Sequence, residues 1–258
     1  MRILFLGDII GKPGRQAVKR LLPALRKRYN PALVIANGEN SAGGFGITED
    51  VYAELIGEGV DVITSGNHIW DRKEVLNFID NADRLLRPLN YPEGSPGTGV
   101  RVFRKDDVEI AVVNLCGRAF MENIDCPFRA ASRCLDGLGE KSPVIIVDMH
   151  AETTSEKIAM GWYLDGRVSA VIGTHTHVQT SDERILPKGT AYITDAGMTG
   201  PVDSVIGMKK ELVIKRFLTQ MPVRFEVATG RLELQGVVLE IEPSTGKATH
   251  IERIKEEV

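Results

Sequence analysis

The sequence predicts an α/β fold in which helices flank a largely parallel β-sheet and antiparallel strands are added late in the chain. Three observations support this fold class. Over residues 2–79, short apolar runs alternate with segments of helical periodicity, as buried parallel strands and their connecting helices do. Near the middle of the chain, two apolar runs are joined by a short polar turn. From Val223 onward, apolar and polar residues alternate, which is typical of antiparallel strands.

The first part of the chain predicts three successive pairs of a strand and a helix. The first strand covers residues 2–6, and the helix after it begins near Gly11 and Pro13 and ends at Asn30-Pro31. Four apolar residues recur at helical spacing within it: Val18, Leu21, Leu22 and Leu25. The other elements follow in the same alternation: a strand at 33–36, a capped helix at 48–56, a strand at 60–64 and a helix at 73–79.

The second part of the chain predicts a change to antiparallel pairing and then a return to buried strands. Strands at 100–104 and 108–115 are joined by a turn at 105–107. The remaining elements are expected in this order: a strand at 144–147, a helix at 153–163, strands at 168–172 and 191–194, and an antiparallel meander from 223 onward with turns at 229–230 and 243–246. No linker, low-complexity tract or internal repeat interrupts the sequence, so residues 1–258 are expected to form a single domain.

Composition and charge exclude several classes of protein. The chain is 43% hydrophobic and 26% charged, as globular proteins are, and its net charge is −3. That charge excludes the strong electrostatic attraction used by non-specific nucleic-acid and membrane binders, so neither kind of partner is expected. No apolar stretch has the length of a membrane span. The spacing of Cys116, Cys126 and Cys134 matches neither a zinc ribbon nor a redox motif, which favours reduced thiols in a cytoplasmic protein.

Polar side chains suited to binding metals follow the predicted strands at the points where the strands end. They are Asp8, Glu39, Asn67, His150, His175 and His177. Because ligands bind at the carboxyl ends of strands in open α/β sheets, we expect these side chains to converge on one rim. In the segment His175-Thr176-His177, alternate residues of an extended chain project to the same side, so two imidazoles can face one cluster.

Each of these residues also has a simpler explanation when it is considered alone. Asp8 could be a turn or helix-cap residue, and Glu39 and Asn67 lie in turns where polar side chains often satisfy the backbone. His150 could be a core histidine with satisfied hydrogen bonds. However, four of the five histidines fall at strand ends, which these explanations do not account for; the fifth, His250, is expected on the surface of a late strand.

The set of donor groups predicts the type of metal centre. Oxygen and nitrogen ligands without thiolates suit iron, manganese or zinc. Asp8 and Glu39 carry two negative charges, so two divalent ions would leave a positive pocket that attracts phosphate. Two metals about 3.5 to 4 Å apart can lower the pKa of a bridging water and clamp the attacking and leaving oxygens of an in-line displacement. The sequence therefore predicts hydrolysis of phosphate esters.

These residues, in this order, resemble the calcineurin-like metallophosphoesterase superfamily. The matching blocks are Gly7-Asp8, Gly66-Asn67-His68, Met149-His150 and Gly173-Thr174-His175-Thr176-His177. The chain departs from the common pattern twice: Ile10 stands where the Asp-x-His motif has its histidine, and Glu39, followed by Asn40, replaces the usual bridging aspartate. Both departures resemble the bacterial YmdB-like subfamily, and the similarity spans essentially the whole chain. Members of that subfamily are described as 2′,3′-cyclic-nucleotide 2′-phosphodiesterases.

The resemblance implies a specific site on a specific fold. It implies a single-domain sandwich of mixed, largely parallel β-sheets flanked by helices, with antiparallel strands at the C-terminus. It also implies two metal ions per subunit, with iron preferred over manganese or zinc. One ion would be held by Asp8, Glu39, Asn40 and His177, and the other by Glu39, Asn67, His150 and His175, so that Glu39 bridges them. Homo-oligomers are plausible from the same resemblance.

In this arrangement His68 is free of metal and is the expected catalytic acid, donating a proton to the leaving oxygen. Its alternative is a turn residue with one backbone hydrogen bond. Asp71, three residues later, is expected to orient His68. Lys12, at the start of the first helix, and Arg118, after a strand end, could contact an anionic substrate, although a solvated helix end is the favoured explanation for Lys12.

The leading interpretation is a phosphodiesterase that converts 2′,3′-cyclic nucleotides to 3′-nucleotides by attack of a metal-bridging hydroxide. The residues alone establish only phosphate-ester hydrolysis, so a phosphomonoesterase or phosphoprotein phosphatase is an alternative of the same class. An alternative of another class is a regulatory nucleotide-binding protein with weak activity. The presence of both carboxylates, the three ligand histidines and His68 favours an enzyme.

Overall fold

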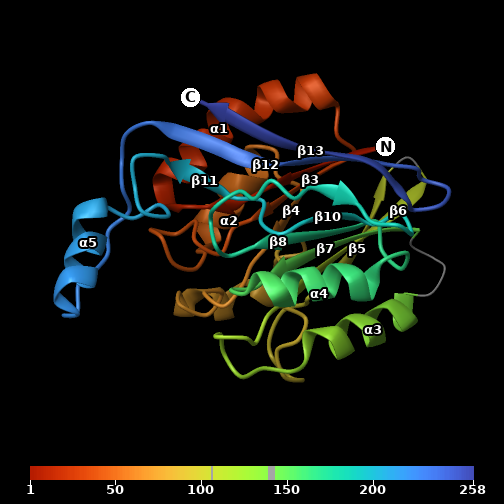
Figure 1. The fold of residues 1–258 in the computed structure, drawn as a ribbon, viewed down its shortest axis with the longest axis horizontal. Coiled ribbons are helices and arrows are strands. Elements are labelled where there is room, and N and C mark those ends of the chain that lie inside the picture. Colours follow the sequence, from red (N-terminus) through yellow and green to blue (C-terminus); the bar gives the residue numbers. More distant parts are fainter. Residues whose placement is uncertain (106, 139–142) are drawn as a thin grey trace.

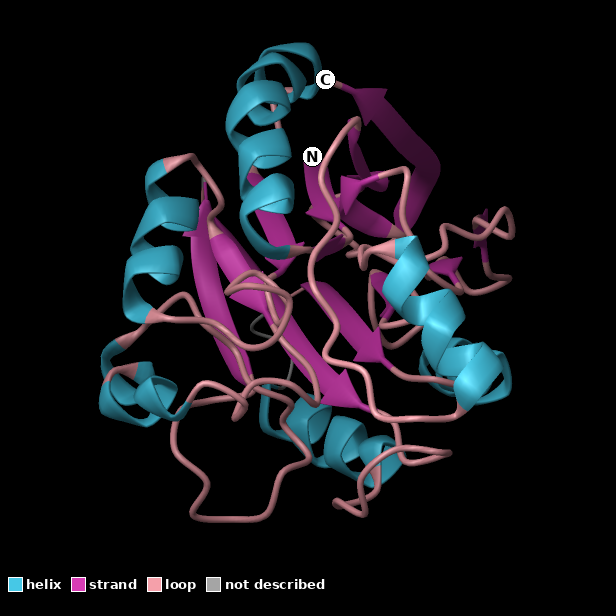
Figure 2. Cartoon of the chain, turned by 90° about the vertical axis from the view of Figure 1, so that its left-hand side faces the viewer, coloured by secondary structure: helices cyan, strands magenta, loops and turns pink. Residues whose placement is uncertain are grey.

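Two β-sheets pack face to face at the centre of the molecule, and helices cover their outer faces (Figures 1 and 2). The computed structural model describes residues 1–105, 107–138 and 143–258. The core between the sheets is formed by alternate residues of strands from both sheets, such as Ile3, Phe5, Ile110 and Ile172. This face-to-face packing makes the fold a four-layer α/β sandwich.

Within the described residues, the first sheet has seven strands. They are β1 (Arg2–Leu6), β2 (Asp8–Ile9), β3 (Leu33–Asn37), β4 (Val62–Thr64), β11 (Met198–Pro201), β12 (Leu232–Ile241) and β13 (Ala248–Glu257). The spatial order is β2-β11-β12-β1-β3-β4, with β13 pairing β12. Strands β1, β3 and β4 run parallel, whereas β12 is antiparallel to β1, β11 and β13.

The described part of the second sheet has six strands in the order β5-β6-β7-β8-β10-β9. Their bounds are β5 (Val100–Lys105), β6 (Val108–Cys116), β7 (Val144–His150), β8 (Ala170–Thr174), β9 (Arg184–Ile185) and β10 (Ala191–Ile193). Its four inner strands are parallel, and β5 and β9 join the two edges antiparallel. Both sheets are therefore mixed. The strands that lead to the candidate ligands belong to the parallel part of each sheet.

The helices cover the outer faces of the two sheets. They are α1 (Gly11–Tyr29), α2 (Glu49–Gly57), α3 (Pro127–Leu138), α4 (Thr154–Leu164) and α5 (Lys210–Thr219), with the short 3-10 helices η1 (Lys73–Asn77) and η2 (Ile79–Asn81). α1 and α2 pack on the first sheet, and α3 and α4 pack on the second. In contrast, α5 projects from the body of the molecule and buries only Val213 (Figure 1). None of the described helices combines the length and the apolar character needed to cross a membrane.

Most elements expected in the N-terminal half are confirmed within one or two residues. The first strand, the helix that ends before Asn30 and the helix capped by Thr48 all form, and the Thr48 side chain accepts a hydrogen bond from Val51. The helix expected at 73–79 forms as two consecutive 3-10 helices, η1 and η2. The turn expected at 105–107 includes Asp106, which lies outside the described residues.

The single sheet expected from the residue pattern is replaced by two sheets, as the family resemblance implies. The antiparallel strands of the C-terminus do not extend an edge: the hairpin of β12 and β13 enters the first sheet beside β1. Residues 223–228, expected to begin the meander, form only an isolated bridge at Val227. Helices α3 and α5 and the short strands β2, β9 and β11 were not predicted. The strands are too short to show a period, whereas the amphipathic pattern of α3 is clear and could have identified that helix.

A buried ion pair connects α4 to the chain that follows β10. Lys157 of α4 and Asp195 are both 0% exposed, and their Nζ and Oδ2 atoms are 2.7 Å apart. Asp195 Oδ1 also accepts a hydrogen bond from the backbone N–H of Gly197, at 2.8 Å. A charged pair without access to water stabilises a fold only if both partners are present.

We therefore expect Lys157→Met to lower the free energy of unfolding by roughly 3 to 5 kcal/mol, because the Asp195 carboxylate stays buried without its cation. Urea denaturation of metal-free protein, followed by circular dichroism, measures this change. Lys19→Met is the matched control, since it removes an exposed ion pair with Glu58 and should alter stability little. Equal stability of Lys157→Met and wild-type protein would show that the buried pair contributes nothing.

Candidate metal centre

The strand ends of both sheets meet at one rim, and the predicted ligands lie there. Asp8 follows β1, Glu39 follows β3 and Asn67 follows β4, all in the first sheet. His150 is the last residue of β7, and His175 directly follows β8, both in the second sheet. The structure thus brings side chains from the two sheets together across the sandwich.

Glu39 lies at the centre of this cluster. Its Oε1 atom is 3.0 Å from His150 Nε2 and 3.1 Å from Asn40 Nδ2. Its Oε2 atom accepts a hydrogen bond from the backbone N–H of His68 at 3.1 Å. The carboxylate is completely buried. Glu39 therefore contacts both halves of the predicted ligand set.

One half of the cluster contains Asp8, Asn40 and His177. Asn40 Nδ2 is 3.2 Å from His177 Nε2, and His177 Nε2 is 3.6 Å from Asp8 Oδ1. The other half contains Asn67, His150 and His175: His150 Nε2 is 3.2 Å from Asn67 Oδ1 and 3.0 Å from His175 Nδ1. All seven predicted ligands thus form one connected group.

The three histidines are oriented by acceptors on the side away from the cluster. His177 Nδ1 donates to the carbonyl oxygen of Ile206 at 3.0 Å, which leaves Nε2 facing Asp8. His175 Nε2 donates to Glu152 Oε2 at 3.0 Å, which leaves Nδ1 facing the cluster. A hydrogen bond at one ring nitrogen fixes the tautomer and leaves the lone pair of the other nitrogen free for a metal.

His150 is oriented by a chain of two further groups. The Thr174 hydroxyl donates its single proton to Asp148 Oδ1 at 2.7 Å, so it accepts from His150 Nδ1, at 2.8 Å. Asp148 lies two residues before His150 on β7 and also accepts from Asn37 Nδ2. The Nε2 atom of His150 is thereby directed at Glu39.

The charges of the cluster shift its pKa values in opposite directions. Burial tends to raise the pKa of Asp8, but the nearby positive charge of His177 lowers it to about 2. Burial tends to lower the pKa of His177, but Asp8 raises it to about 9. Burial and the neighbouring His150 lower the pKa of His175 to about 3, so this imidazole is neutral at pH 7. The buried carboxylates are thus stabilised in their charged form by positive charge beside them.

A divalent cation fits this arrangement of donor atoms. Asp8 Oδ1 is buried and has no hydrogen-bond partner among the described residues, which is costly unless the atom binds a cation. Glu39, His150 and His175 each present one donor atom, and these atoms lie within 4.8 Å of one another. Carboxylate, amide and imidazole donors are those that iron, manganese and zinc accept.

Gly66, the first residue of the Gly-Asn-His motif, is required by the close packing of the cluster. A Cβ atom at this position would lie 2.2 Å from the ring of His150 and 2.4 Å from Glu39 Oε2. Any other residue would push the Asn67 turn away from the carboxylate. Gly66 therefore leaves room for His150 and Glu39, a role that its place in the Gly-Asn-His motif did not reveal.

His68 lies beside the cluster and contacts none of its oxygens through its ring. Its Nδ1 atom is 2.9 Å from Asp71 Oδ2, the contact that the expected orienting role requires. Its ring packs edge-on against Phe45, with centroids 5.2 Å apart. The second nitrogen, Nε2, is thus the atom available to exchange a proton with a ligand.

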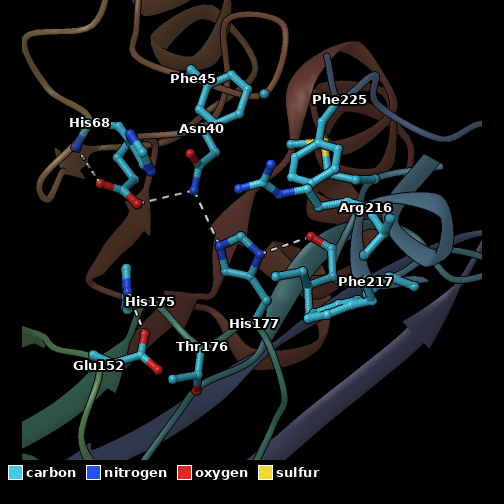
Figure 3. Close-up of a pocket in the computed structure, with 16 residues that line it drawn as sticks. Asn40, Phe45, His68, Glu152, His175, Thr176, His177, Arg216, Phe217 and Phe225 are labelled. Atoms are coloured by element: carbon cyan, nitrogen blue, oxygen red, sulfur yellow. Dashed lines mark hydrogen bonds and ion pairs between the residues drawn. The ribbon is translucent and has the colours of Figure 1, made fainter. Parts of the chain in front are cut away.

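A cavity of about 410 Å³ opens next to the cluster. Figure 3 shows Asn40, His68, His175 and His177 on its polar side, with Phe217 and Phe225 on the side away from His68 and His175. Sequence reasoning missed these two phenylalanines as well as Glu152. A glutamate two residues after a strand-end histidine is a signal that could have identified Glu152. Arg118 and Lys12 do not line this cavity; they line two other surface hollows.

Comparison with known proteins identifies the relatives of this chain. Residues 4–254 match the family described as YmdB-like protein. A Bacillus subtilis (strain 168) protein described as 2′,3′-cyclic-nucleotide 2′-phosphodiesterase is 55% identical over 254 residues, covering 98% of this chain and 96% of that protein. A putative phosphatase/phosphodiesterase of Mycoplasma genitalium is 39% identical, covering 99% of this chain and 92% of that protein.

Solved structures share the same fold. A hypothetical protein from Thermus thermophilus superposes with a TM-score of 0.94 at 46% identity, covering 100% of this chain and 99% of that one. A structure titled as a novel phosphatase, from Mycoplasma pneumoniae, superposes with a TM-score of 0.95 at 39% identity, covering 100% and 93% of the two chains. Together with the family match over nearly its whole length, these similarities show that the chain belongs to the YmdB-like family of the metallophosphoesterase fold.

Proposed function

We propose that this protein is a metal-dependent phosphodiesterase that hydrolyses 2′,3′-cyclic nucleotides to 3′-nucleotides. The observation that carries the proposal is the connected group of seven donor side chains, with Glu39 at its centre and a buried Asp8 oxygen that has no hydrogen-bond partner among the described residues. The choice of a cyclic nucleotide is supported by the name of the 55% identical Bacillus subtilis relative. The reaction breaks the bond between phosphorus and O2′ and adds water across it.

The donor set divides into two sites that share Glu39. Asp8, Asn40 and His177 would hold one ion together with Glu39, and Asn67, His150 and His175 would hold the other. Divalent ions bound there supply positive charge to the phosphoryl oxygens and lower the pKa of water to near neutrality. We propose iron, with manganese or zinc as alternatives, because these metals accept mixed oxygen and nitrogen donors.

The protein's own proton donor in this scheme is His68. As the bond to phosphorus breaks, negative charge develops on O2′, and a proton from His68 Nε2 neutralises it. Asp71 holds Nδ1 at 2.9 Å and so fixes the ring with Nε2 directed away from Asp71. Phe45 packs on the ring and restricts its rotation.

We further propose that residues 1–258 act as one domain in the cytoplasm and associate as a homo-oligomer. The core shared by the two sheets supports a single domain, because strands from both halves of the chain contribute to it. Cys116, Cys126 and Cys134 are all free thiols, which suits a reducing compartment.

Removal of the metals should abolish turnover, and their return should restore it. We expect chelator-treated protein to leave 2′,3′-cyclic AMP intact, and Fe²⁺ or Mn²⁺ to restore conversion to 3′-AMP, measured by chromatography of the nucleotides. Glu39→Gln protein treated in the same way should not recover, since its bridging carboxylate is lost. Full activity of the stripped enzyme, formation of 2′-AMP, or faster cleavage of p-nitrophenyl phosphate than of bis-p-nitrophenyl phosphate would contradict the proposal.

Replacing His68 by alanine should lower kcat by at least about 100-fold, because the leaving oxygen loses its proton donor. The metal content, measured by elemental analysis, should stay at the wild-type value because the His68 ring is not a ligand. Asp71→Asn should give a smaller loss of kcat, since the ring is retained but less firmly oriented. An unchanged kcat in metal-loaded His68→Ala protein would exclude the acid role.

A further inference from the structure

The cavity beside the metal centre has one polar side and one apolar side, and apart from Phe45 the apolar side has no part in the proposed reaction. Glu39, Asn40, His175 and His177 form part of the polar side. The described apolar lining comes from three separate segments: Gly44 and Phe45; Val205, Ile206 and Met208; and Val213, Phe217 and Phe225. At about 410 Å³ the cavity is within the range of small-molecule sites and is much larger than a phosphate group requires.

The apolar side is held in a fixed relation to the metal centre. Ile206 contributes to the lining, and its carbonyl oxygen accepts the hydrogen bond from His177 Nδ1 at 3.0 Å. Met208 forms an isolated β-bridge with Val227, and Val227 lies two residues after Phe225. Lys209, at the start of α5, donates its backbone N–H to Glu226 at 2.9 Å. The segments that carry the aromatic rings are thus connected to a candidate ligand.

Phe217 is the least protected part of this surface. It is 71% exposed, although it lines the cavity next to groups that would bind an anion. Exposed apolar surface at the mouth of a pocket commonly marks a ligand site, because water leaves it readily. Arg216 extends toward Asn40 beside Phe225 and is the one arginine or lysine in the described lining (Figure 3). An occupant with an aromatic part and an anionic part matches this surface.

We propose that Phe217 and Phe225, with Phe45 opposite, form the binding subsite for the base of the nucleotide. This inference rests on the proposed phosphodiesterase activity and specifies which part of the substrate the apolar side receives. A base presents a flat π-surface, and stacking on a phenyl ring is tolerant of which base is present. The subsite therefore selects for nucleosides over base-free sugar phosphates, without strong selection among the four bases.

A base-free substrate separates this inference from the activity on which it rests. Methyl β-D-riboside 2′,3′-cyclic phosphate keeps the sugar and the cyclic phosphate but carries a methyl group where the base would be. We expect metal-loaded wild-type protein to hydrolyse it with a KM about tenfold above that for 2′,3′-cyclic AMP, the loss that one stacking contact accounts for. The two values of kcat should be similar.

Substitution of Phe217 tests the residue directly. Phe217→Ala should raise the KM for 2′,3′-cyclic AMP about tenfold and leave the KM for the methyl riboside unchanged. Phe217→Trp keeps an aromatic face and should retain the low KM. Leu218→Ala is the matched control, because Leu218 follows on the same helix, is 81% exposed and is not part of the cavity lining. It should change neither constant.

The possible outcomes distinguish failure of the subsite from failure of the activity. Equal KM values for the two substrates in wild-type protein, or an equal rise in both with Phe217→Ala, would overturn the base subsite while the phosphodiesterase stands. If Phe217→Ala and Leu218→Ala both lost activity and both had a lower molecular mass in analytical ultracentrifugation, this face of α5 would be a contact with a second copy of the chain. That result would also overturn the base subsite. Absence of hydrolysis of either substrate by metal-loaded wild-type protein would overturn both proposals.

Discussion

The buried carboxylate of Asp195 is the constraint on which the histidine loop depends. Its Oδ2 atom accepts hydrogen bonds from Lys157 Nζ at 2.7 Å and from the backbone N–H and hydroxyl of Thr176 at 3.1 and 2.6 Å. Thr176 lies between His175 and His177, whose φ angles of 98° and 64° are unfavourable for residues with a side chain. The extended segment expected at His175-Thr176-His177 is therefore wrong, since the strand ends at Thr174 and the chain turns to bring both imidazoles to the cluster. Such strain, of about 1 to 3 kcal/mol per residue, persists only where the surroundings fix it. The ion pair with Lys157 thus does more than satisfy two buried charges. By holding Asp195 it keeps Thr176 in place, and Thr176 in turn fixes the positions of the two imidazoles on either side of it.

The same anchor extends to the other sheet. Asp195 Oδ1 binds the backbone N–H of Gly197, and the Gly197 carbonyl oxygen accepts the backbone N–H of Asp8 at 3.0 Å. The backbone N–H of His175 in turn donates to Asp8 Oδ2 at 3.2 Å. Because backbone atoms carry these links, the separation of Asp8 and the histidines is set before any metal is present. A cation bound here would stabilise the charged carboxylates of Asp8 and Glu39, as the neighbouring His177 and His150 do in this structure.

The parts of the site that follow local rules could be predicted from the sequence, and the parts that depend on distant pairing could not. Asp8, Glu39 and Asn67 were found because short apolar strands precede them and parallel strands end at one edge. Asp71 was found because the superfamily that the chain resembles often has an acidic residue after the Gly-Asn-His motif, and here two residues separate Asp71 from His68. Lys157 and Asp195 were missed, since a lysine on a helix and an aspartate after a strand are ordinary surface residues until the fold buries both. The entry of β12 beside β1 was missed for a similar reason: the alternation of its residues predicts a strand but not its neighbours.

The two sides of the cavity differ in how firmly the fold holds them, and this difference bears on function. Glu39, on the polar side, and His150, which contacts it from behind the cavity lining, are completely buried and lie at the ends of strands that share a core. Phe217, on the apolar side, belongs to a helix that contributes only Val213 to the buried interior. Chemistry at phosphorus requires atoms held to within a fraction of an ångström, whereas stacking tolerates displacement of the rings. With the base in the proposed subsite, a rigid rim can therefore keep the reaction unchanged while substitutions on α5 change how tightly the nucleoside binds. Such substitutions cost little stability, because Val213 is the one buried residue of α5.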